Sequence, residues 1–333
     1  MSVAVVILNW NGKEFMQKFL PPLIERTKHQ DRKYTIIVAD NGSNDGSVEW
    51  LKETYSEDIV KTILFDQNYG FTGGYNKAFD TIKSSEGEYK YYLLLNSDVE
   101  VSEAWLDPLY ELMEADYKIG ICSPKVLSYH NREYFEHAGA CGGLIDRFGF
   151  PYCRGRVLST IEKDKGQYDQ ASEIFWASGT SFMIRSELWH RLGGLDNIFF
   201  AHMEEIDMCW RAKLLGYQVW VEPKSKIYHV GGGTLPNNSP RKLYLNFRNN
   251  LLMLHKNLPA RGRSYKIFLR QCIDGCIGIV YLLTGKWSFF KSVIKAHNDF
   301  RKLRKEAIIS EKIYPVTFSK ATLIGLKIKS LFH

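Results

Sequence analysis

Residues 202–211, HMEEIDMCWR, place three carboxylates within four positions of a stretch that has the pattern of an amphipathic helix. On a helix, Glu204 and Asp207 lie three residues apart and Arg211 lies four beyond Asp207, so these side chains share a face. We expect them to form a ladder of ion pairs, with Glu205 pointing away from it. The alternative interpretation is a solvated, charged helix face without a catalytic role.

Glu205 faces an apolar strip of the same predicted helix. Its helical neighbours are Met208, Cys209 and Ala212, and burial against them would raise the pKa of its carboxyl group. A carboxylate with a raised pKa is a stronger base at neutral pH. Glu205 is therefore the first candidate for a general base.

Four short apolar runs in the first hundred residues alternate with amphipathic segments. The runs are residues 3–8, 34–40, 59–65 and 91–98. Strands that are apolar throughout are buried on both faces, and strands separated by helices form parallel sheets. The pattern therefore predicts a parallel α/β sheet.

Each predicted strand runs into a loop rich in Asn, Asp and Gly. The carboxyl ends of parallel strands meet at one edge of a sheet, where ligands bind. Turn chemistry would explain one such loop, whereas four in succession favour a shared ligand site. The residues that we expect there are Asn9, Asn11, Asp40, Asn41, Asn68, Gly74, Asn76, Asn96 and Asp98.

The class of ligand follows from what these loops contain and lack. The sequence has no GxxxxGK[ST] motif, and no GxGxxG follows the first strand, which argues against Walker-type NTPases and dinucleotide-dependent oxidoreductases. A nucleotide site built from acids and amides remains. Asn96-Ser97-Asp98 adds an amide and a carboxylate two residues apart, which suits a hard divalent cation shared with substrate phosphates.

Five motifs in this order, VVILNWNG, IIVADNGSNDGS, NYGFTGGYN, LLLNSDV and FFAHMEEIDMCWR, resemble those of family 2 glycosyltransferases with the GT-A fold. The resemblance is strongest to the bacterial rhamnosyltransferase-like branch that builds surface polysaccharides, and it covers roughly residues 3–255. It implies a mostly parallel central sheet flanked by helices in a catalytic domain of residues 1–258. Residues 259–333 would form a helical C-terminal extension.

The resemblance also implies roles for individual residues. Asp40 is similar to the aspartate that contacts the nucleotide base, and Asp98 to the acid of a DxD-type motif that holds Mg²⁺ or Mn²⁺ on the diphosphate. Asn96 replaces the first acid of that motif and removes one charge from the cation site. His229 resembles a histidine that completes the metal or diphosphate site, and the alternative is a strand-end histidine without a ligand.

In the family's ED-type motif the second acid is the base, and Glu205 occupies that position although the family usually has Asp there. The resemblance therefore implies that Glu205 takes the proton of an attacking sugar hydroxyl. We expect Glu204 and Asp207, the other two candidate catalytic acids, to position the helix with Arg211 and to contact the acceptor.

A segment similar to residues 175–196 lines the acceptor side in the family. Here it contains Trp176, Ser178 and Gly179. The indole of Trp176 offers a flat apolar face on which a sugar would stack, while the alternative is a tryptophan of the core.

A loop and a set of cations follow His229. The run Gly231-Gly232-Gly233 would let a loop close over the substrate. Arg241, Lys242 and Arg248 are candidates to meet phosphate charge, and we place Arg248 with the donor. The alternative for these three cations is solvated surface.

The C-terminal part of the chain is basic and apolar. Residues 260–333 contain fifteen Lys and Arg against four Asp and Glu, a net of +11, so the preceding residues carry −4 of the total of +7. The apolar stretch 265–283 is interrupted by three charges, which favours amphipathic helices lying on a membrane over a spanning helix. We expect an anionic membrane surface as partner. A solvated tail is the alternative, and no motif accompanies the charge to indicate nucleic acid.

Two features concern the cellular compartment. The six cysteines are scattered without CxxC pairs, which predicts free thiols in a reducing compartment. The stretch MSVAVVILNW has no basic region and no small-residue cleavage site. We expect a cytoplasmic protein that is peripheral on the cytoplasmic face of the inner membrane.

Together these inferences predict an inverting, metal-dependent glycosyltransferase. It would move a sugar from a nucleoside-diphosphate donor to a hydroxyl of a lipid-linked cell-surface glycan, with a polyprenyl diphosphate as the lipid carrier. Rhamnose from dTDP-rhamnose is favoured and a UDP-sugar comes next. The alternatives are a sugar nucleotidyltransferase and a non-catalytic nucleotide-sugar binding module at the membrane.

Overall fold

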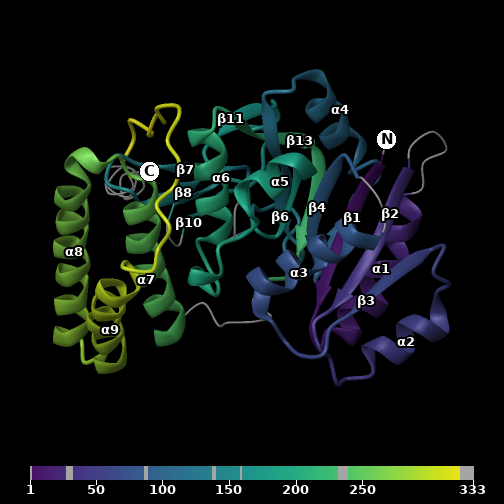
Figure 1. Ribbon diagram of the computed structural model, residues 1–333, viewed down its shortest axis with the longest axis horizontal. Helices are drawn as coiled ribbons and strands as arrows, with labels where there is room; N and C mark the ends of the chain where they lie inside the picture. The colour runs from purple at the N-terminus through teal and green to yellow at the C-terminus, as the bar shows by residue number, and fades with distance from the viewer. Residues whose placement is uncertain are drawn as a thin grey trace.

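The computed structural model describes residues 2–27, 33–85, 89–136, 140–157, 160–231 and 239–322. A large sheet covered by helices makes up one side of the molecule, and the helices α7, α8 and α9 stand together on the other (Figure 1). The strands are β1 (Ser2–Asn9), β2 (Lys33–Asp40), β3 (Val60–Leu64), β4 (Tyr91–Asn96), β5 (Val99–Val101), β6 (Ile119–Ser128), β7 (Gly143–Ile145), β8 (Pro151–Cys153), β9 (Arg156–Val157), β10 (Thr160–Ile161), β11 (Ser172–Ile174), β12 (Ser181–Arg185) and β13 (Gln218–His229). The helices are α1 (Lys13–Thr27), α2 (Ser47–Thr54), α3 (Gly70–Ser85), α4 (Asp107–Ala115), α5 (Ser186–Leu192), the short 3-10 helix η1 (Asn197–Phe199), α6 (Glu204–Leu214), α7 (Pro240–Asn257), α8 (Ala260–Leu283) and α9 (Trp287–Leu303).

The central sheet has the strand order β11-β13-β6-β12-β4-β1-β2-β3, and β5 pairs with β13. β3, β2, β1 and β4 are parallel to one another, as the alternating pattern predicts. β12 runs antiparallel to both β4 and β6, while β13 is parallel to β6. The sheet is therefore mixed and mostly parallel. The small strands β7 to β10 form a separate antiparallel sheet.

The register of the parallel strands aligns the polar loops. Asn9 pairs with Asp40, and Leu8 pairs with both Ala39 and Asn96. The carboxyl ends of β1, β2 and β4 therefore meet at one edge of the sheet, which confirms the expected arrangement of the loops.

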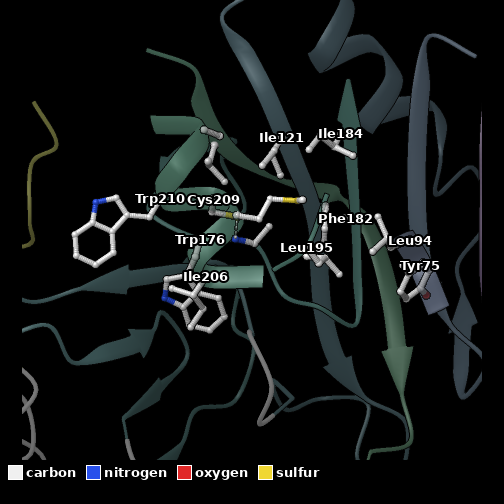
Figure 2. Close-up of a cluster of buried hydrophobic side chains, with 14 of the residues drawn as sticks. Tyr75, Leu94, Ile121, Trp176, Phe182, Ile184, Leu195, Ile206, Cys209 and Trp210 are labelled. Atoms are coloured by element: carbon white, nitrogen blue, oxygen red, sulfur yellow. Dashed lines mark hydrogen bonds between the residues drawn. The ribbon is translucent and has the colours of Figure 1, made fainter. Parts of the chain in front are cut away.

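The two faces of the sheet carry two apolar clusters, and β4 contributes to both. Tyr92 and Leu94 belong to one cluster, and Leu93 and Leu95 to the other. Side chains alternate between the faces of a strand, so a strand covered on both sides must be apolar at every position. Figure 2 shows the first cluster, in which Leu94 lies near Tyr75 of α3 and Phe182 of the neighbouring strand β12.

One helix begins earlier than its sequence indicates. α3 begins at Gly70, although three of its first five residues are glycines. Glycines are poor helix formers, so a glycine-rich segment such as 70–74 is typical of a loop. The Oδ1 atom of Asn68 accepts a hydrogen bond from the backbone N–H of Gly70 at 2.7 Å, and this bond supports the first turn.

The C-terminal part is helical, as expected. α7 packs against α8 and α9, and the segment that follows α9 returns to the sheet domain, where the N–H groups of Ile313 and Tyr314 both donate to the carbonyl of Leu214. Within the described part of the chain, no helix is long and apolar enough to cross a membrane.

Candidate active site

The loops after β1 and β2 are joined through buried side chains. The Nδ2 atom of Asn9 donates to Oδ2 of Asp40 at 2.9 Å, and the N–H of Ser43 donates to Oδ1 of the same carboxylate at 2.8 Å. Asn9 and Asp40 are 0% and 2% exposed. Both carboxylate oxygens of Asp40 are thus hydrogen-bonded within the loops, one to Asn9 and the other to Ser43.

Asn11 reinforces the same junction from a left-handed backbone conformation, with φ of 51°. Its N–H donates to Oγ of Ser43 at 2.9 Å, and its Oδ1 accepts from the N–H of Asn44 at 2.8 Å. The structure therefore brings Asn11 to the predicted site as a link between loops.

The loop after β3 joins this group through Asn41. Its Oδ1 accepts from the N–H of Tyr69 at 2.9 Å, and its Nδ2 donates to Oδ1 of Asn68 at 2.9 Å and to the carbonyl of Gly70 at 3.1 Å. Gly74 lies so close that a β-carbon on it would stand 2.7 Å from Leu8 and 3.1 Å from Asn41. Six of the predicted donor residues thus form one cluster.

One atom in this cluster is left over. Oδ1 of Asn9 is buried and has no hydrogen-bond partner among the described residues. A β-carbon on Gly12 would stand 2.6 Å from this oxygen and 3.4 Å from Oγ of Ser97. A buried amide oxygen is normally hydrogen-bonded, so this acceptor at the loop edge is available to a ligand.

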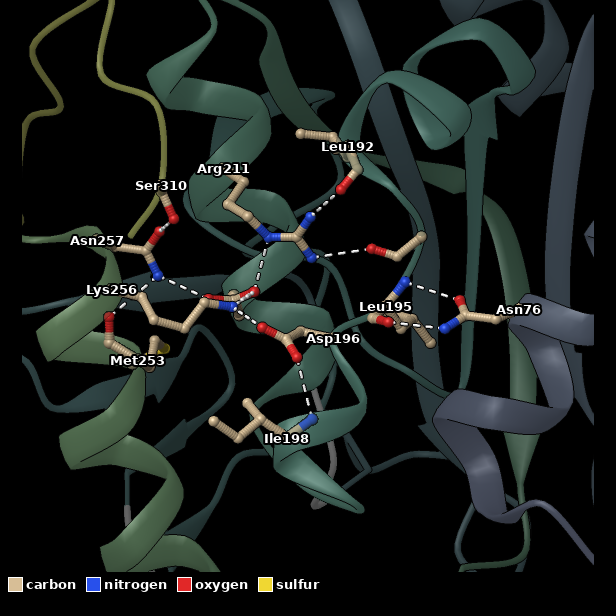
Figure 3. A network of polar contacts seen from close by, with 12 residues as sticks. Asn76, Leu192, Leu195, Asp196, Ile198, Arg211, Met253, Lys256, Asn257 and Ser310 are labelled. Atoms are coloured by element: carbon tan, nitrogen blue, oxygen red, sulfur yellow. Dashed lines mark hydrogen bonds and ion pairs between the residues drawn. The ribbon is translucent and has the colours of Figure 1, made fainter. Parts of the chain in front are cut away.

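Asn76 has a different environment from the one expected. Its Nδ2 donates to the carbonyl of Leu195 at 2.7 Å, and its Oδ1 accepts from the N–H of Leu195 at 2.9 Å, which ties α3 to the segment after α5 (Figure 3). Both ends of the amide are bonded there, so the structure does not group Asn76 with the donor loops.

Asp98 and His229 meet at the end of β4. Nε2 of His229 lies 3.2 Å from Oδ1 of Asp98, and its Nδ1 lies 3.5 Å from Oε1 of Glu136. Burial opposes the charge on the imidazole, but the two acids outweigh it and raise the pKa of His229 to about 10. Burial would likewise raise the pKa of Asp98, yet the hydrogen bond and charge of His229 hold it below the usual value.

Asp98 and His229 together offer one carboxylate and one imidazole as possible metal ligands. Among the described residues, no group of three or more His, Cys, Asp or Glu side chains is arranged to hold a metal ion. One carboxylate and one imidazole fit a divalent cation that takes its remaining ligands from a diphosphate and water. The two acids give the site negative charge, and a bound cation would take the place of the proton on His229. Asn96 donates its backbone N–H to the carbonyl of Thr180 at 3.0 Å.

Helix α6 begins with the two adjacent acids. Glu204 is 6% exposed, and burial together with the charges of Glu205 and Asp207 raises its pKa well above the usual value. Burial also raises the pKa of Glu205, to about 7, although the backbone N–H groups at the start of the helix oppose this rise. Oε2 of each residue is buried without a hydrogen-bond partner in the described chain. The pKa of Glu205 is therefore raised, and burial is the cause, as the sequence predicts.

The carboxylate of Asp207 accepts hydrogen bonds from two cationic side chains and one amide. Its carboxylate, 0% exposed, receives Nε of Arg211 at 2.7 Å, Nζ of Lys256 at 2.9 Å and Nδ2 of Asn257 at 2.7 Å. Figure 3 shows Arg211, Lys256 and Asn257 in this network. Burial would raise the pKa of Asp207, but the charges of Arg211 and Lys256 lower it.

The expected ion-pair ladder is therefore only half correct. Arg211 pairs with Asp207, but its other two nitrogens donate to the carbonyls of Leu192 and Gly194, and not to Glu204. The side chain of Glu204 lies beside Glu205 instead. Helical spacing alone allows both arrangements, and the turn before α6 decides between them.

On the predicted acceptor side, Gly179 lies against the candidate base. A β-carbon on Gly179 would stand 3.7 Å from the Glu205 side chain, so this position leaves room beside the carboxylate. Ser178 is buried and accepts from the N–H of Thr180 at 3.2 Å. Trp176 is 5% exposed, packs on Gly143 and donates Nε1 to the carbonyl of Leu144 at 3.1 Å, so its face is covered by protein (Figure 2).

The predicted phosphate-binding cations have separate environments. Arg248 is 9% exposed and donates Nη2 to the carbonyl of Phe199 at 2.8 Å, so its contacts lie in the turn before α6 and not in the donor loops. Arg241 is exposed and lies 5.8 Å from the ring centroid of Phe200. Burial lowers the pKa of Lys242, whose charge interacts with Glu136. Residues 232–238, including Gly232 and Gly233, lie outside the described residues.

The structure adds three residues to which the motifs gave no role. Glu136 reaches His229 from the segment after β6, and His202, whose pKa is lowered to about 4 by burial and by the charge of Lys242, precedes α6. Asn249 is buried beside that turn. Each comes from a segment of ordinary composition, and only the position of His202 next to the three carboxylates gave a signal.

Comparison with known proteins places this geometry in context. Residues 2–193 match the family model described as "Glycosyl transferase family 2". The low-salt glycan biosynthesis hexosyltransferase Agl10 of Haloferax volcanii is 24% identical over 252 residues, 75% of each chain. An N-acetylglucosaminyl-diphospho-decaprenol L-rhamnosyltransferase of Mycobacterium tuberculosis is 20% identical over 68% of this chain and 75% of its own.

Solved structures agree on the fold. Residues 1–349 of S. aureus TarS in complex with UDP-GlcNAc superpose with a TM-score of 0.59 at 14% identity, over 92% of this chain and 84% of that one. The mannosyltransferase PcManGT from Pyrobaculum calidifontis, in complex with GDP-Man and Mn²⁺, gives 0.54 at 14% identity over 90% and 86%. These similarities confirm the GT-A architecture, a mostly parallel sheet followed by C-terminal helices.

Proposed function

The chain belongs to glycosyltransferase family 2, and we propose that it is an inverting, metal-dependent enzyme that transfers a sugar from a nucleoside diphosphate to a glycan hydroxyl. The observation that carries the proposal is the position of Glu205. Its carboxyl group has a pKa raised to about 7, and it lies at the start of α6 beside Gly179. A base tuned to neutral pH is what the deprotonation of an attacking hydroxyl requires.

The donor would bind at the loops after β1, β2, β3 and β4. The unpartnered Oδ1 of Asn9 is the acceptor that the site offers to a nucleobase N–H. Asp40 holds Asn9 in place through its hydrogen bond. We therefore assign base recognition to Asn9 and Asp40 together.

Asp98 and His229 are the residues that would hold Mg²⁺ or Mn²⁺. When bound, the cation supplies positive charge to the departing diphosphate. The remaining work falls to the chain's own residues, chiefly to those that keep the acceptor hydroxyl beside Glu205.

The transfer is a single displacement. The acceptor oxygen bonds to the anomeric carbon while the bond from that carbon to the diphosphate oxygen breaks, and the nucleoside diphosphate leaves with the electron pair. The hydroxyl proton passes to Glu205. Burial and the charge of Glu205 raise the pKa of Glu204, which favours a single negative charge in the pair, carried by Glu205 in this proposal.

The donor sugar and acceptor are inferred from the relatives. The M. tuberculosis relative is an L-rhamnosyltransferase that acts on N-acetylglucosaminyl-diphospho-decaprenol. We therefore favour rhamnose on a dTDP carrier, with UDP-sugars next, and a polyprenyl-diphosphate-linked glycan as acceptor.

The outer face of α8 supports a membrane location for such an acceptor. Tyr265, Phe268, Ile279 and Leu283 are 66%, 60%, 53% and 80% exposed along this helix, and Trp287 at the start of α9 is 60% exposed. α8 forms the outer edge of the molecule, away from the sheet (Figure 1). An apolar stripe with basic neighbours is typical of a helix lying in a membrane interface.

We propose, accordingly, a catalytic domain of residues 1–258 and a membrane-binding extension of residues 259–333, on the cytoplasmic face of the inner membrane. α7 connects the two, because it packs against α8 and α9 as well as against η1 and α6.

The test is release of nucleoside diphosphate from a panel of dTDP-, UDP- and GDP-sugars, with and without Mn²⁺ or Mg²⁺, in the presence of a polyprenyl-diphosphate-linked acceptor. Metal-dependent release from one donor, lost in Asp98→Ala, is the expected result. If no donor reacts and none binds in calorimetry, the proposed function is wrong.

A further inference from the structure

The turn that leads into α6 has an unusual backbone. Phe200, His202 and Met203 have positive φ angles of 65°, 68° and 76°, and Glu204 follows directly. Residues with a β-carbon avoid this region, and each such residue costs of order 1–3 kcal/mol. Three of them in four positions persist only if the surrounding structure holds the turn.

Asn249 on α7 provides this support. Its side chain is 0% exposed, and Nδ2 donates to the carbonyls of Phe199 at 2.9 Å, Ala201 at 2.8 Å and His202 at 2.7 Å. One amide nitrogen therefore gathers three carbonyls of the strained turn.

Arg248 fixes the direction of that amide. Its Nε donates to Oδ1 of Asn249 at 2.8 Å, which leaves Nδ2 facing the turn. Its Nη2 donates to the carbonyl of Phe199 at 2.8 Å. The side chains of two consecutive residues thus hold one turn in one conformation.

We infer that Asn249 is a positioning residue, which holds the strained turn and thereby keeps the carboxylate of Glu205 at its place at the start of α6. This inference rests on the proposed function, in which Glu205 is the base. Positioning of this kind has large effects, since a misplacement of about 1 Å can cost about 100-fold in rate.

The turn also controls the charge of Glu205. The N–H groups of Met203, Glu205 and Ile206 support its carboxylate and limit the rise of its pKa. The other ionisable groups near it are Glu204 on the same helix, Cys209 one turn further and Cys153 of β8. If the turn relaxes, the N–H support weakens and the pKa of Glu205 rises.

Asn250 supplies a matched control. It is 1% exposed on the same helix, donates Nδ2 to the carbonyl of Gly149 at 2.9 Å, and accepts from Arg270 of α8. Its loss should weaken packing of the helices without touching the turn before α6.

The experiment compares Asn249→Asp and Asn249→Ala with Asn250→Asp and Asn250→Ala in the full chain. Asp at position 249 places an oxygen where the donor was, opposite three carbonyls. We expect the Asn249 variants to lower kcat 10- to 100-fold and to leave donor affinity in calorimetry within twofold of the native value. The part of the pH profile in which the rate rises with pH should move to higher pH. The Asn250 variants should lower only Tm. Arg248→Lys, a milder change, serves if the Asn249 variants do not fold, and it should shift the same limb.

A double variant separates this inference from the proposed function. If Asn249 acts through Glu205, then Glu205→Gln with Asn249→Ala should be no slower than Glu205→Gln alone. Additive losses, or Asn249 variants that match the Asn250 variants in kcat and pH profile, would overturn the inference. A Glu205→Gln protein with native turnover would instead remove the proposed role of Glu205 as the base, on which this inference rests.

Discussion

The Oδ1 atom of Asp98 lies 3.2 Å from Nε2 of His229, and the pairing of two strands explains the contact. β5 runs antiparallel to β13 with Val99 opposite His229, and the N–H of Val230 donates to the carbonyl of Asp98 at 3.1 Å. The backbone ladder thus places the imidazole beside the acid at the end of β4, where a diphosphate would lie.

Removal of either side chain should abolish the response to a divalent cation. In Asp98→Ala and His229→Ala we expect loss of Mn²⁺-stimulated release of nucleoside diphosphate and weaker Mn²⁺ binding in titration calorimetry, because each change removes one of two protein ligands. His190→Ala is the control, because this histidine lies on α5 and contacts the hydroxyl group of Tyr92. A native Mn²⁺ response in both variants would exclude this site.

Glu205→Gln should lower kcat by about 10²- to 10⁴-fold, the usual contribution of a general base. The amide keeps the size of the side chain but cannot take the proton. Donor affinity, measured by calorimetry, should stay near the native value because the proposed function places Glu205 on the acceptor side. If turnover survives in Glu205→Gln but is lost in Glu204→Gln, then the base is Glu204.

The rate should rise with pH through about 7, as Glu205 loses its proton, and then level off. A pH profile of kcat/KM for the native protein and for Glu205→Gln checks this, and the variant should lack the rising limb. A native profile that is flat between pH 5.5 and 8.5 would speak against Glu205 as the titrating group.

The same group predicts how stability depends on pH. The folded state holds the Glu205 proton more tightly than the unfolded chain, so this group lowers stability as pH rises from about 4.5 to about 7. Glu205→Gln should therefore melt at a higher temperature than the native protein at pH 8 and at a similar temperature at pH 4. An equal difference in Tm at both pH values would show that the effect is not titration.

Asp207→Asn should affect stability more than chemistry. The carboxylate is buried between Arg211, Lys256 and Asn257, and loss of one member of a buried pair costs about 3–5 kcal/mol. Denaturant unfolding should show this loss, while kcat per folded molecule should stay within a few-fold. A large loss of kcat at native stability would place Asp207 in the reaction after all.

The membrane proposal depends on the outer face of α8. Leu283 and Ile308 are both 80% exposed, but only Leu283 belongs to the stripe on this helix. Leu283→Ser should weaken binding to anionic vesicles about tenfold, since a buried leucine contributes about 1.5–3 kcal/mol. Ile308→Ser should bind as the native protein does. Equal effects of the two changes in a flotation assay would refute a specific role for the stripe.

The sequence by itself determined the architecture and the class of site. Apolar runs predicted parallel strands buried on both faces, and the four polar loops were correctly expected to meet at their carboxyl ends. The resemblance of five motifs gave the family, which the comparison confirms. These inferences succeed because a strand's pattern depends on which faces are buried, and that information is local.

The tertiary structure decided what each polar side chain does. Helical spacing set Glu205 apart but left Glu204 and Asp207 equivalent on one charged face, whereas Lys256 and Asn257 of α7 donate hydrogen bonds to Asp207. Arg248 was expected at a phosphate and holds a backbone turn instead. Both outcomes depend on α7 folding back against α6. Because the charge state of a buried acid depends on cations that are close in space and remote in sequence, only the folded chain could separate Asp207 from Glu204.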